Sequence, residues 1–359
     1  MKKLFVLLTI IVIFAVFSIS SSAEESAEDY ISDAKEVLPD EISVLIEDVD
    51  AMTEAIGIEA VLRDIYLSLS GEKNGILAFF LSLLGISALL SLPLGLGEKI
   101  SSAVTVGIGI ISSLLIFSSL SGLFSGVSDT LYRVSELFTS LIPIMVGVTS
   151  LGGGAATAGV QAAGMYTTAS LVGRAASWIL LPIAGFGLAM SLISAFGNDA
   201  TASITKGVKS LFMWIIGMLT ALVGGTISLQ TMISAAADSA AMRAARYMAS
   251  GLIPVVGATV SGALSTLAAG ISYAKGIIGA GAIIAILSII SSPLVTLLGY
   301  RLALSVASMV AELVSSTTAV RIFTAYRFSL DTLTAVYALS SIIYILEIIL
   351  FAKVGVALL

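Results

Sequence analysis

The chain contains no cysteine and no histidine, and only 11% of its 359 residues are charged. Without cysteine there are no disulfides, iron–sulfur clusters or thiolate nucleophiles. Without histidine, the commonest general base and the commonest metal ligand are missing. Hydrophobic residues make up 58% of the chain, and the mean hydropathy is +1.09. These values exclude a soluble enzyme, a disordered tail and a nucleic-acid binder, and they predict a polytopic membrane protein.

The few charges are segregated along the chain. Residues 24–73 contain 15 acidic and 3 basic residues, whereas the chain from residue 74 onward contains 8 acidic and 12 basic residues. Within the acidic part, apolar residues recur at helical spacing from Ile42 to Ile56, which predicts a helical region. Its acid clusters lack the spacing and the glycine of an EF-hand loop, so no calcium site is expected. This region is either a self-packed solvated cap or a docking surface for an extracytoplasmic partner.

The first 23 residues have the parts of a signal peptide. Lys2 and Lys3 supply positive charge, and the run from Leu4 to Phe17 supplies an apolar region of 14 residues. Small residues then precede a cut after Ala23. An uncleaved signal anchor is the alternative, and both place the acidic region outside the cytoplasm. The predicted organisation is a signal peptide over 1–23, an acidic extracytoplasmic helical region over 24–74 and a polytopic transmembrane domain over 75–359.

Nine apolar windows follow, each long enough to cross a bilayer core, for which a helix needs about 17–25 residues. They are residues 76–96, 100–127, 140–164, 175–197, 210–231, 252–274, 277–298, 302–320 and 331–352. The windows at 140–164 and 252–274 are rich in glycine and alanine, so each is expected to be re-entrant or broken. If every window crosses once, the twelve basic residues from residue 74 onward divide six against six between the two sides, so the positive-inside rule assigns no topology. The predicted fold class is an all-α polytopic membrane helix bundle.

An internal repeat is predicted within this domain. The tripeptide Leu-Ile-Pro ends at Pro143 and again at Pro254, and a further proline follows each after 39 residues, at Pro182 and Pro293. The offset of 111 residues relates two segments, residues 140–197 and residues 251–308. Interruptions by glycine and proline at matching places in two halves are typical of broken helices along a transport pathway. The alternative is that they only allow helices to pack closely.

One acidic residue, Glu312, lies in the middle of an apolar window, where a charged side chain costs about 2.5–3.5 kcal/mol on insertion scales. It is expected to face water or a partner, either in an ion or proton relay or in a structural ion pair. Arg301 lies about 16 Å away along the same helix face, too far for a direct partner. Arg174 and Lys275 are the candidate partners, and Glu347 is a second acid nearer the end of its window.

Small residues and four polar side chains characterise residues 230–249. Alanine or serine recurs almost every third or fourth position, which would let another helix approach closely. Arg243, Arg246 and Tyr247 share one helix face at spacings of 3 and 4, and Asp238 precedes them. Tyrosine and arginine suit a membrane–water interface. The segment is therefore predicted to be an interfacial helix, with a simple polar connector as the alternative.

The sequence contains no recognisable catalytic or nucleotide-binding motif. The glycines at 152–154 lack the Gly-Lys-Ser/Thr ending of a P-loop, and no Gly-x-Ser-x-Gly elbow with a histidine partner exists. No catalytic, cofactor-binding or metal-binding residue is assigned, and a non-enzymatic protein is expected.

One run begins Leu229-Gln230-Thr231, continues through Asp238, Arg243 and Ala245-Arg246-Tyr247, and ends Ile253-Pro254-Val255-Val256-Gly257. This run resembles a characteristic stretch of the stage III sporulation protein AE family. The layout of the rest of the chain is similar to that family of endospore-forming bacteria. The resemblance implies a place in a membrane complex, similar to a secretion or feeding channel, that bridges mother cell and forespore. It also implies the mother-cell membrane around the forespore as the location, and it supplies no catalytic residues.

Two functional hypotheses follow. In the first, the chain is a non-enzymatic subunit of a sporulation transenvelope channel, with the lipid bilayer and other stage III sporulation membrane proteins as partners; self-association is left open, and no nucleic acid or cofactor is expected. In the second, it is a stand-alone secondary transporter, with a site formed by Glu312 and by broken helices near Pro143 and Pro254. An intramembrane hydrolase is a weaker third idea, because no residue set supports it.

Overall fold

The computed structural model describes residues 58–92, 98–151, 155–193, 199–252 and 257–353, without the side chains of 234–269 and of some shorter stretches at helix ends. These residues contain helices and no strand, which confirms the predicted all-α class. The helices are α3 (Ile58–Ser91), α4 (Glu98–Leu151), α5 (Ala155–Ala175), the π-helical turn η2 (Ala176–Leu180), α6 (Leu181–Ile193), α7 (Asp199–Leu252), α8 (Gly257–Leu313) and α9 (Thr317–Lys353).

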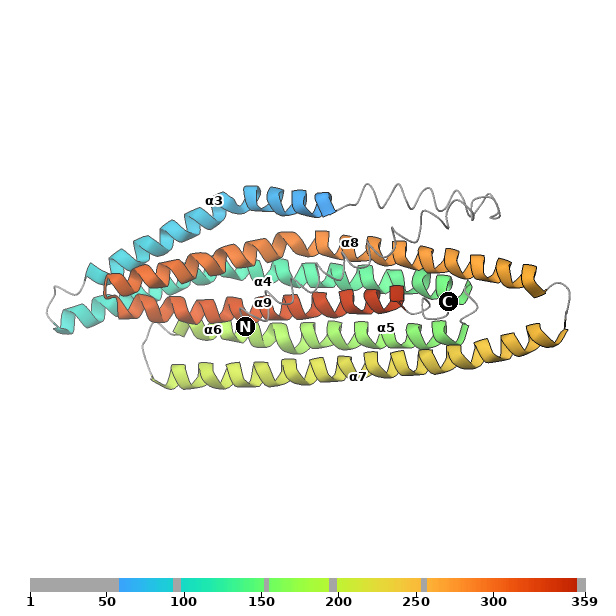
Figure 1. Ribbon diagram of the computed structural model, residues 1–359. Helices are drawn as coiled ribbons and strands as arrows, with labels where there is room; N and C mark the ends of the chain where they lie inside the picture. Colours follow the sequence, from blue (N-terminus) through green and yellow to red (C-terminus); the bar gives the residue numbers. More distant parts are fainter. Residues whose placement is uncertain (1–57, 93–97, 152–154, 194–198, 253–256, 354–359) are drawn as a thin grey trace.

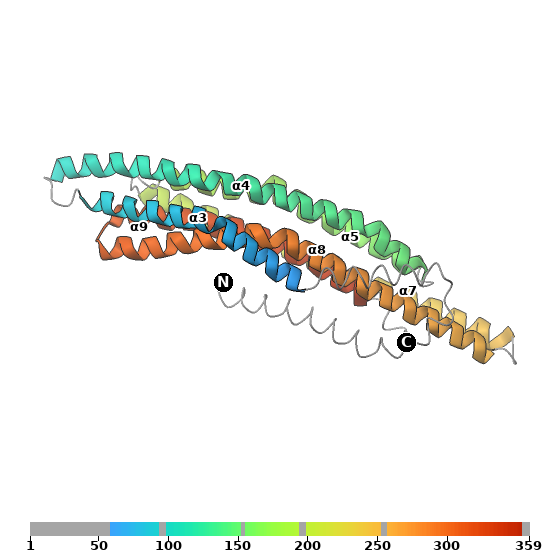
Figure 2. The same cartoon turned by 90° about the horizontal axis from the view of Figure 1, so that it is seen from above.

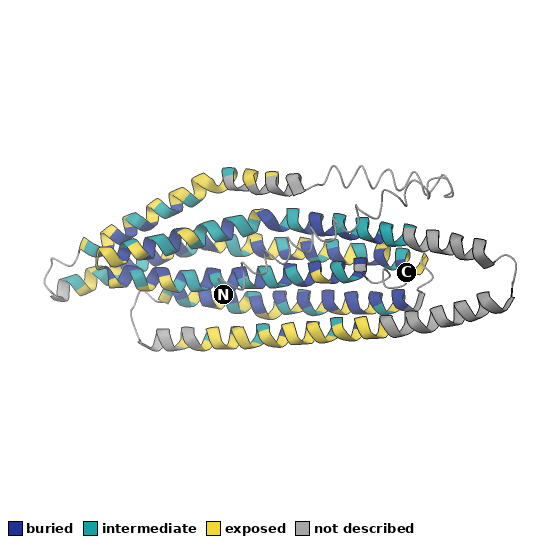
Figure 3. Ribbon diagram, in the orientation of Figure 1, coloured by how far each residue is buried: buried dark blue, intermediate teal, exposed yellow. Residues whose placement is uncertain are grey.

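The helices lie side by side along one long axis and form an elongated bundle (Figures 1 and 2). Helix α8 packs on α9, α3 and α4, while α5 packs between α4 and α7. Within its most apolar stretch, 61% of α9 is buried, against 17% of α7, so α9 is central and α7 peripheral (Figure 3). Large aromatic side chains fill the centre, including Tyr326, Tyr337, Tyr344, Phe138, Phe323 and Phe351. The rings of Phe138 and Tyr344 join α4 to α9, with their centroids 4.7 Å apart.

Six of the described helical segments are long and apolar enough to cross a membrane. They are Ser70–Ser91, Ser101–Leu151, Thr157–Ile193, Gly207–Ile233, Gly270–Leu313 and Thr317–Ala352. The prediction of a multi-helix membrane body is therefore confirmed, but the count of nine windows is wrong. The windows at 252–274 and 277–298 lie mostly or wholly in α8, and the window at 302–320 begins in it, because the helix continues through Lys275 and Arg301, where the sequence suggested boundaries. Lysine and arginine interrupt hydropathy without lowering helix propensity.

Three of these helices exceed the thickness of one bilayer core. Helices α4 and α7 have 54 residues each, and α8 has 57. At 1.5 Å per residue, each is about 80 Å long, whereas a hydrocarbon core is about 30 Å thick. Halfway along α4, the charged residues Asp129, Arg133 and Glu136 are exposed. The bundle therefore extends beyond a single core and carries charge on its surface between apolar stretches.

The predicted break near Pro143 does not occur, because α4 continues through this residue to Leu151. The window at 140–164 is instead divided between α4 and α5, which begins at Ala155. Helix α8 likewise continues through Pro293. In membrane helices, neighbouring helices and serine or threonine side chains satisfy the carbonyl groups that a proline frees. Pro182 is the second residue of α6, which follows the π-helical turn η2, and single π-helical turns of this kind occur as irregularities inside α-helices.

Two predicted features lie largely outside the described residues. Pro254 is one of them, so the break predicted there stays a prediction. The acidic region is described only from Ile58 onward, as the first turns of α3. The internal repeat and the signal peptide also stay predictions.

Candidate functional site

A buried acid, Glu347 on α9, lies at the centre of the most distinctive polar site. Its side chain is only 1% exposed, and it accepts a hydrogen bond of 2.6 Å from Thr168 Oγ1 on α5. The Gln230 side chain on α7 lies within hydrogen-bonding reach of the same carboxyl. Three helices that are far apart in sequence therefore bring polar groups to one point inside the apolar bundle.

A second pair of residues extends this site toward α4. Gln230 Nε2 donates to the Gln161 backbone oxygen on α5, at 3.5 Å. Thr149 Oγ1 on α4 donates to Gln161 Oε1, at 3.0 Å. We refer to the five residues Thr149, Gln161, Thr168, Gln230 and Glu347 as the Glu347 cluster.

A glycine makes room for this cluster. A Cβ atom at Gly164 on α5 would collide with the side-chain amide of Gln230. By contrast, a Cβ at Gly159 on the same helix would meet nothing within 4 Å. Small residues on α5 thus let the Gln230 side chain of α7 approach the α5 backbone closely, as is common where helices pack in membranes.

Two atoms of the Glu347 cluster have no hydrogen-bond partner. They are Glu347 Oε2 and Gln230 Oε1, and both are buried. A buried polar atom left unpaired costs about 1–3 kcal/mol. With Glu347 ionised, the cluster therefore contains two buried acceptor oxygens without a hydrogen-bond donor.

A second buried polar cluster joins α4, α6 and α9 without any charge. Tyr326 OH donates to the Ser113 backbone oxygen at 2.7 Å, and Ser113 Oγ donates to the Leu192 oxygen at 3.2 Å. Ser191 and Ser329 share a hydrogen bond of 3.0 Å between their hydroxyl groups. Because these hydroxyl groups have partners, this cluster serves to hold three helices together.

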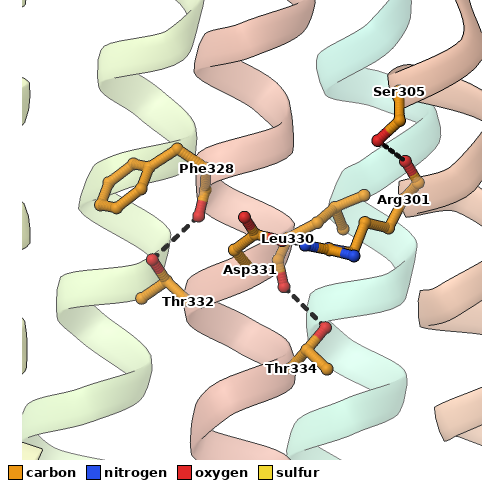
Figure 4. A network of polar contacts seen from close by, with 7 residues as sticks. All are labelled: Arg301, Ser305, Phe328, Leu330, Asp331, Thr332 and Thr334. Atoms are coloured by element: carbon orange, nitrogen blue, oxygen red, sulfur yellow. Dashed lines mark hydrogen bonds and ion pairs between the residues drawn. The ribbon is translucent and has the colours of Figure 1, made fainter. Parts of the chain in front are cut away.

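An ion pair between Arg301 on α8 and Asp331 on α9 forms a third polar contact (Figure 4). The two side chains are 33% and 23% exposed, so the pair is partly shielded from solvent. Thr334 donates to the Leu330 backbone oxygen instead of to Asp331. Arg301 is thus the group that neutralises Asp331, and the inference that it does not pair with Glu312 is correct.

Glu312 does not lie in the middle of a helix, as the window at 302–320 suggested. Glu312 is exposed and lies one residue before the end of α8. The chain turns back immediately afterwards, since Ser315 adopts a left-handed conformation with φ of 57° and Ser316 N–H donates to the Ala311 oxygen at 3.0 Å. The window at 302–320 is therefore the end of one helix and the start of the next, which places Glu312 at a hairpin.

The remaining predicted residues lie on α7 and after it. Asp238, Arg243, Arg246 and Tyr247 belong to α7, but their side chains lie outside the described part of the structure. Their proposed interfacial role stays a prediction. Gln230, which opens the same stretch, is the member that the structure places in a site.

A half-open pocket of about 240 Å³ lies beside η2. Arg174, Tyr132 and Trp178 line it together with several serines. Trp178 is 82% exposed and Tyr132 is 70% exposed. Aromatic and arginine side chains of this kind suit the boundary between lipid and water. Arg174 therefore faces this pocket at the surface and is not a partner of Glu312.

No group of three or more acidic, histidine or cysteine side chains gathers in the part of the chain that the structure describes. The buried polar groups of the described helices form hydrogen bonds between helices, and they include no arrangement of nucleophile, base and orienting group. The chemistry that this arrangement supports is recognition and helix–helix contact within a membrane.

Comparison with known families places these features in context. The family model of stage III sporulation protein AE matches residues 77–355, while no curated protein and no solved structure matches the chain. The matched region begins within α3, continues past the end of α9, and contains every residue of the Glu347 cluster. This is a family of sporulation membrane proteins and is not known as a family of enzymes. The family model matches most of the chain, and the matched region is a polytopic helical body of the kind that the composition predicts. The protein is therefore a member of the stage III sporulation protein AE family.

Proposed function

We propose that the chain is a non-enzymatic multi-pass subunit of a channel complex that connects the mother cell with the forespore during spore formation. The observation that carries this proposal is the family match over residues 77–355, on a body with six apolar helices that could cross a membrane. Other stage III sporulation membrane proteins are the proposed partners. The proposed location is the mother-cell membrane around the forespore, with residues 24–74 on the extracytoplasmic side.

The dimensions of the bundle support a role inside a larger assembly. Helices of 54–57 residues extend beyond one hydrocarbon core. Exposed charges on α4, at Asp129, Arg133 and Glu136, lie between two apolar stretches of the same helix. A charged side chain that faces lipid is costly, so these residues suit contact with water or with charged partner proteins.

Loss of the chain is expected to stop spore formation after engulfment, because the forespore would lose its connection to the mother cell. An in-frame deletion should lower the count of heat-resistant spores by orders of magnitude, and microscopy should show engulfed forespores that develop no further. A copy of the gene at another site should restore the count. Normal spore yield from the deletion strain would contradict the proposed function.

The described helices give less support to the transporter hypothesis than to the channel subunit. Glu312 is exposed at a hairpin, and α4 is continuous through Pro143. A specific test separates the two functions: a transporter would move solute in liposomes that contain this chain alone, whereas a channel subunit is expected to need its partner proteins.

A further inference from the structure

The pocket beside η2 carries one positive charge and no acid. Helix α4, helix α5 with η2, and helix α9 all contribute to its wall, and Arg174 is the charged residue among the described residues that line it. Arg174 forms no ion pair with another described residue, since the ion pair found there joins Arg301 to Asp331. The guanidinium of Arg174 is therefore available to an anion from outside the chain.

Serine hydroxyl groups line the same pocket. Ser170 and Ser177 lie four residues before and three residues after Arg174, at spacings that bring them to the same side of a helix. Ser340 on α9 is only 2% exposed and belongs to the inner wall. A hydroxyl group donates one hydrogen bond and accepts others, so these serines add donors to the one that Arg174 supplies.

The π-helical turn η2 presents two of the lining side chains. Leu181 N–H donates to the Ala176 oxygen, five residues back, which is the hydrogen bond of a π-helix. Ser177 and Trp178 lie within this turn, and both line the pocket. Single π-helical turns inside α-helices are frequent at functional sites. The irregularity in the helix thus coincides with the pocket.

The pocket lies where an apolar stretch of the bundle ends. Asp129 and Glu136 are exposed on α4, one turn to either side of Tyr132, and neither lines the pocket. Beyond them, α4 carries no charged residue from 137 to 151, and α5 carries none from 155 to 173. At 1.5 Å per residue the stretch of α5 is about 28 Å long, close to the thickness of a hydrocarbon core, about 30 Å. This position suits the level of lipid headgroups.

We propose that this pocket binds the phosphate group of an anionic phospholipid, with Arg174 as the residue that pairs with the phosphate. A guanidinium binds phosphate through two parallel hydrogen bonds, and the serine hydroxyl groups donate to the remaining oxygens. One arginine balances the single negative charge of a phosphodiester headgroup. Basic pockets between membrane helices bind anionic headgroups in this way.

The aromatic side chains favour a lipid over a soluble phosphate ion. Trp178 is 82% exposed and Tyr132 is 70% exposed, and both lie at the pocket. Such side chains settle at the boundary between headgroups and acyl chains. A phospholipid would place its phosphate at Arg174 and its apolar part against these rings, whereas a free phosphate ion would leave the rings without a ligand.

Tryptophan fluorescence tests the proposal, because the chain has two tryptophans and one of them lines the pocket. The full chain with Trp214→Phe keeps Trp178 alone, and it is placed in phosphatidylcholine vesicles that contain a small share of lipid with brominated acyl chains, which quench tryptophan on contact. Brominated phosphatidylglycerol is expected to quench Trp178 at an about tenfold lower share than brominated phosphatidylcholine, as one charge-assisted contact would give. Equal quenching by the two lipids would overturn the proposal.

Variants of the same single-tryptophan chain separate the pocket from a general effect of charge. Arg174→Gln should abolish the preference for phosphatidylglycerol, and Arg174→Lys should keep part of it, because lysine retains the charge and loses the planar fork. The matched control Arg133→Gln removes an exposed arginine of α4 that does not line the pocket, so the preference should remain. Equal losses in Arg174→Gln and Arg133→Gln would contradict a specific site.

Two further measurements distinguish the ligand and the place. Ser177→Phe keeps Arg174 and fills part of the pocket, so it should lower the preference; an unchanged preference would show that the lipid does not enter the pocket. Inorganic phosphate, added at constant ionic strength, should leave the preference intact. Its loss under phosphate alone would assign the pocket to a soluble anion and overturn the lipid site.

Discussion

Replacing Arg301 by methionine is expected to destabilise the contact between α8 and α9 by about 2–3 kcal/mol. Breaking a buried ion pair on one side leaves an uncompensated charge, which costs about 3–5 kcal/mol. The Arg301–Asp331 pair is 33% and 23% exposed (Figure 4), so part of that cost is relieved by solvent. The measurement is the thermal unfolding midpoint of the purified protein in detergent micelles, compared with that of the wild-type chain.

A second substitution separates the charge effect from lost packing. If the cost of Arg301→Met comes from the unpaired carboxylate of Asp331, then adding Asp331→Asn should recover most of the lost stability, since no charge is left unpaired. Arg301→Lys should lie between the wild-type chain and Arg301→Met, because lysine keeps the charge and loses the planar guanidinium. Equal midpoints for the single and double variants would show that Asp331 does not depend on Arg301.

A valine at Gly299 is expected to push α3 away from α8. A Cβ at this position would collide with the side chain of Ile76 on α3, and nearby the rings of Phe79 and Tyr300 pack with centroids 4.8 Å apart. Overpacking of a tight contact typically costs about 1–3 kcal/mol. The change should lower the thermal midpoint and make α3 more sensitive to added protease.

The same contact offers a compensating variant and a matched control. Ile76→Ala removes the atoms with which the new side chain would collide, so the pair Gly299→Val and Ile76→Ala should be more stable than Gly299→Val alone. Gly281→Val, also on α8, should cost much less, because a Cβ there would meet nothing within 4 Å. Similar losses for the valines at 299 and 281 would mean that helix propensity, and not the contact with α3, determines the effect.

The membrane class of the protein could be predicted from composition, whereas the number of helices could not. Hydropathy falls at Lys275 and at Arg301, yet α8 runs through both. In water-free surroundings the backbone stays hydrogen-bonded within a helix wherever neighbours can accommodate a polar side chain. Arg301 is accommodated by Asp331, which is 30 residues away in the chain. That pairing is a tertiary contact, so a reading of local hydropathy does not detect it.

The identity of the buried acid in the candidate site could not be predicted from the local sequence either. Glu312 and Glu347 both stand among apolar residues in the sequence, and local context favoured Glu312 as the buried acid. The structure reverses this order, because the left-handed turn at Ser315 ends the span beside Glu312. Glu347 is buried by Thr168 and Gln230, which are separated from it by more than a hundred residues. The signal that was available was Gln230 itself, at the start of the stretch that resembles the family.

Labelling of single cysteines in this cysteine-free chain tests the central claim, that the apolar helices of the bundle lie in lipid. Glu312→Cys is exposed at a hairpin, whereas Ile111→Cys on α4 and Leu222→Cys on α7 would lie on outward-facing apolar surfaces, where the native side chains are 63% and 48% exposed. With a water-soluble thiol reagent that has access to both sides of the membrane, Glu312→Cys should react quickly. The cysteines at 111 and 222 should react only after the membrane is dissolved and the protein denatured. Rapid reaction at 111 and 222 in intact membranes, at the rate seen for 312, would contradict a lipid-embedded bundle.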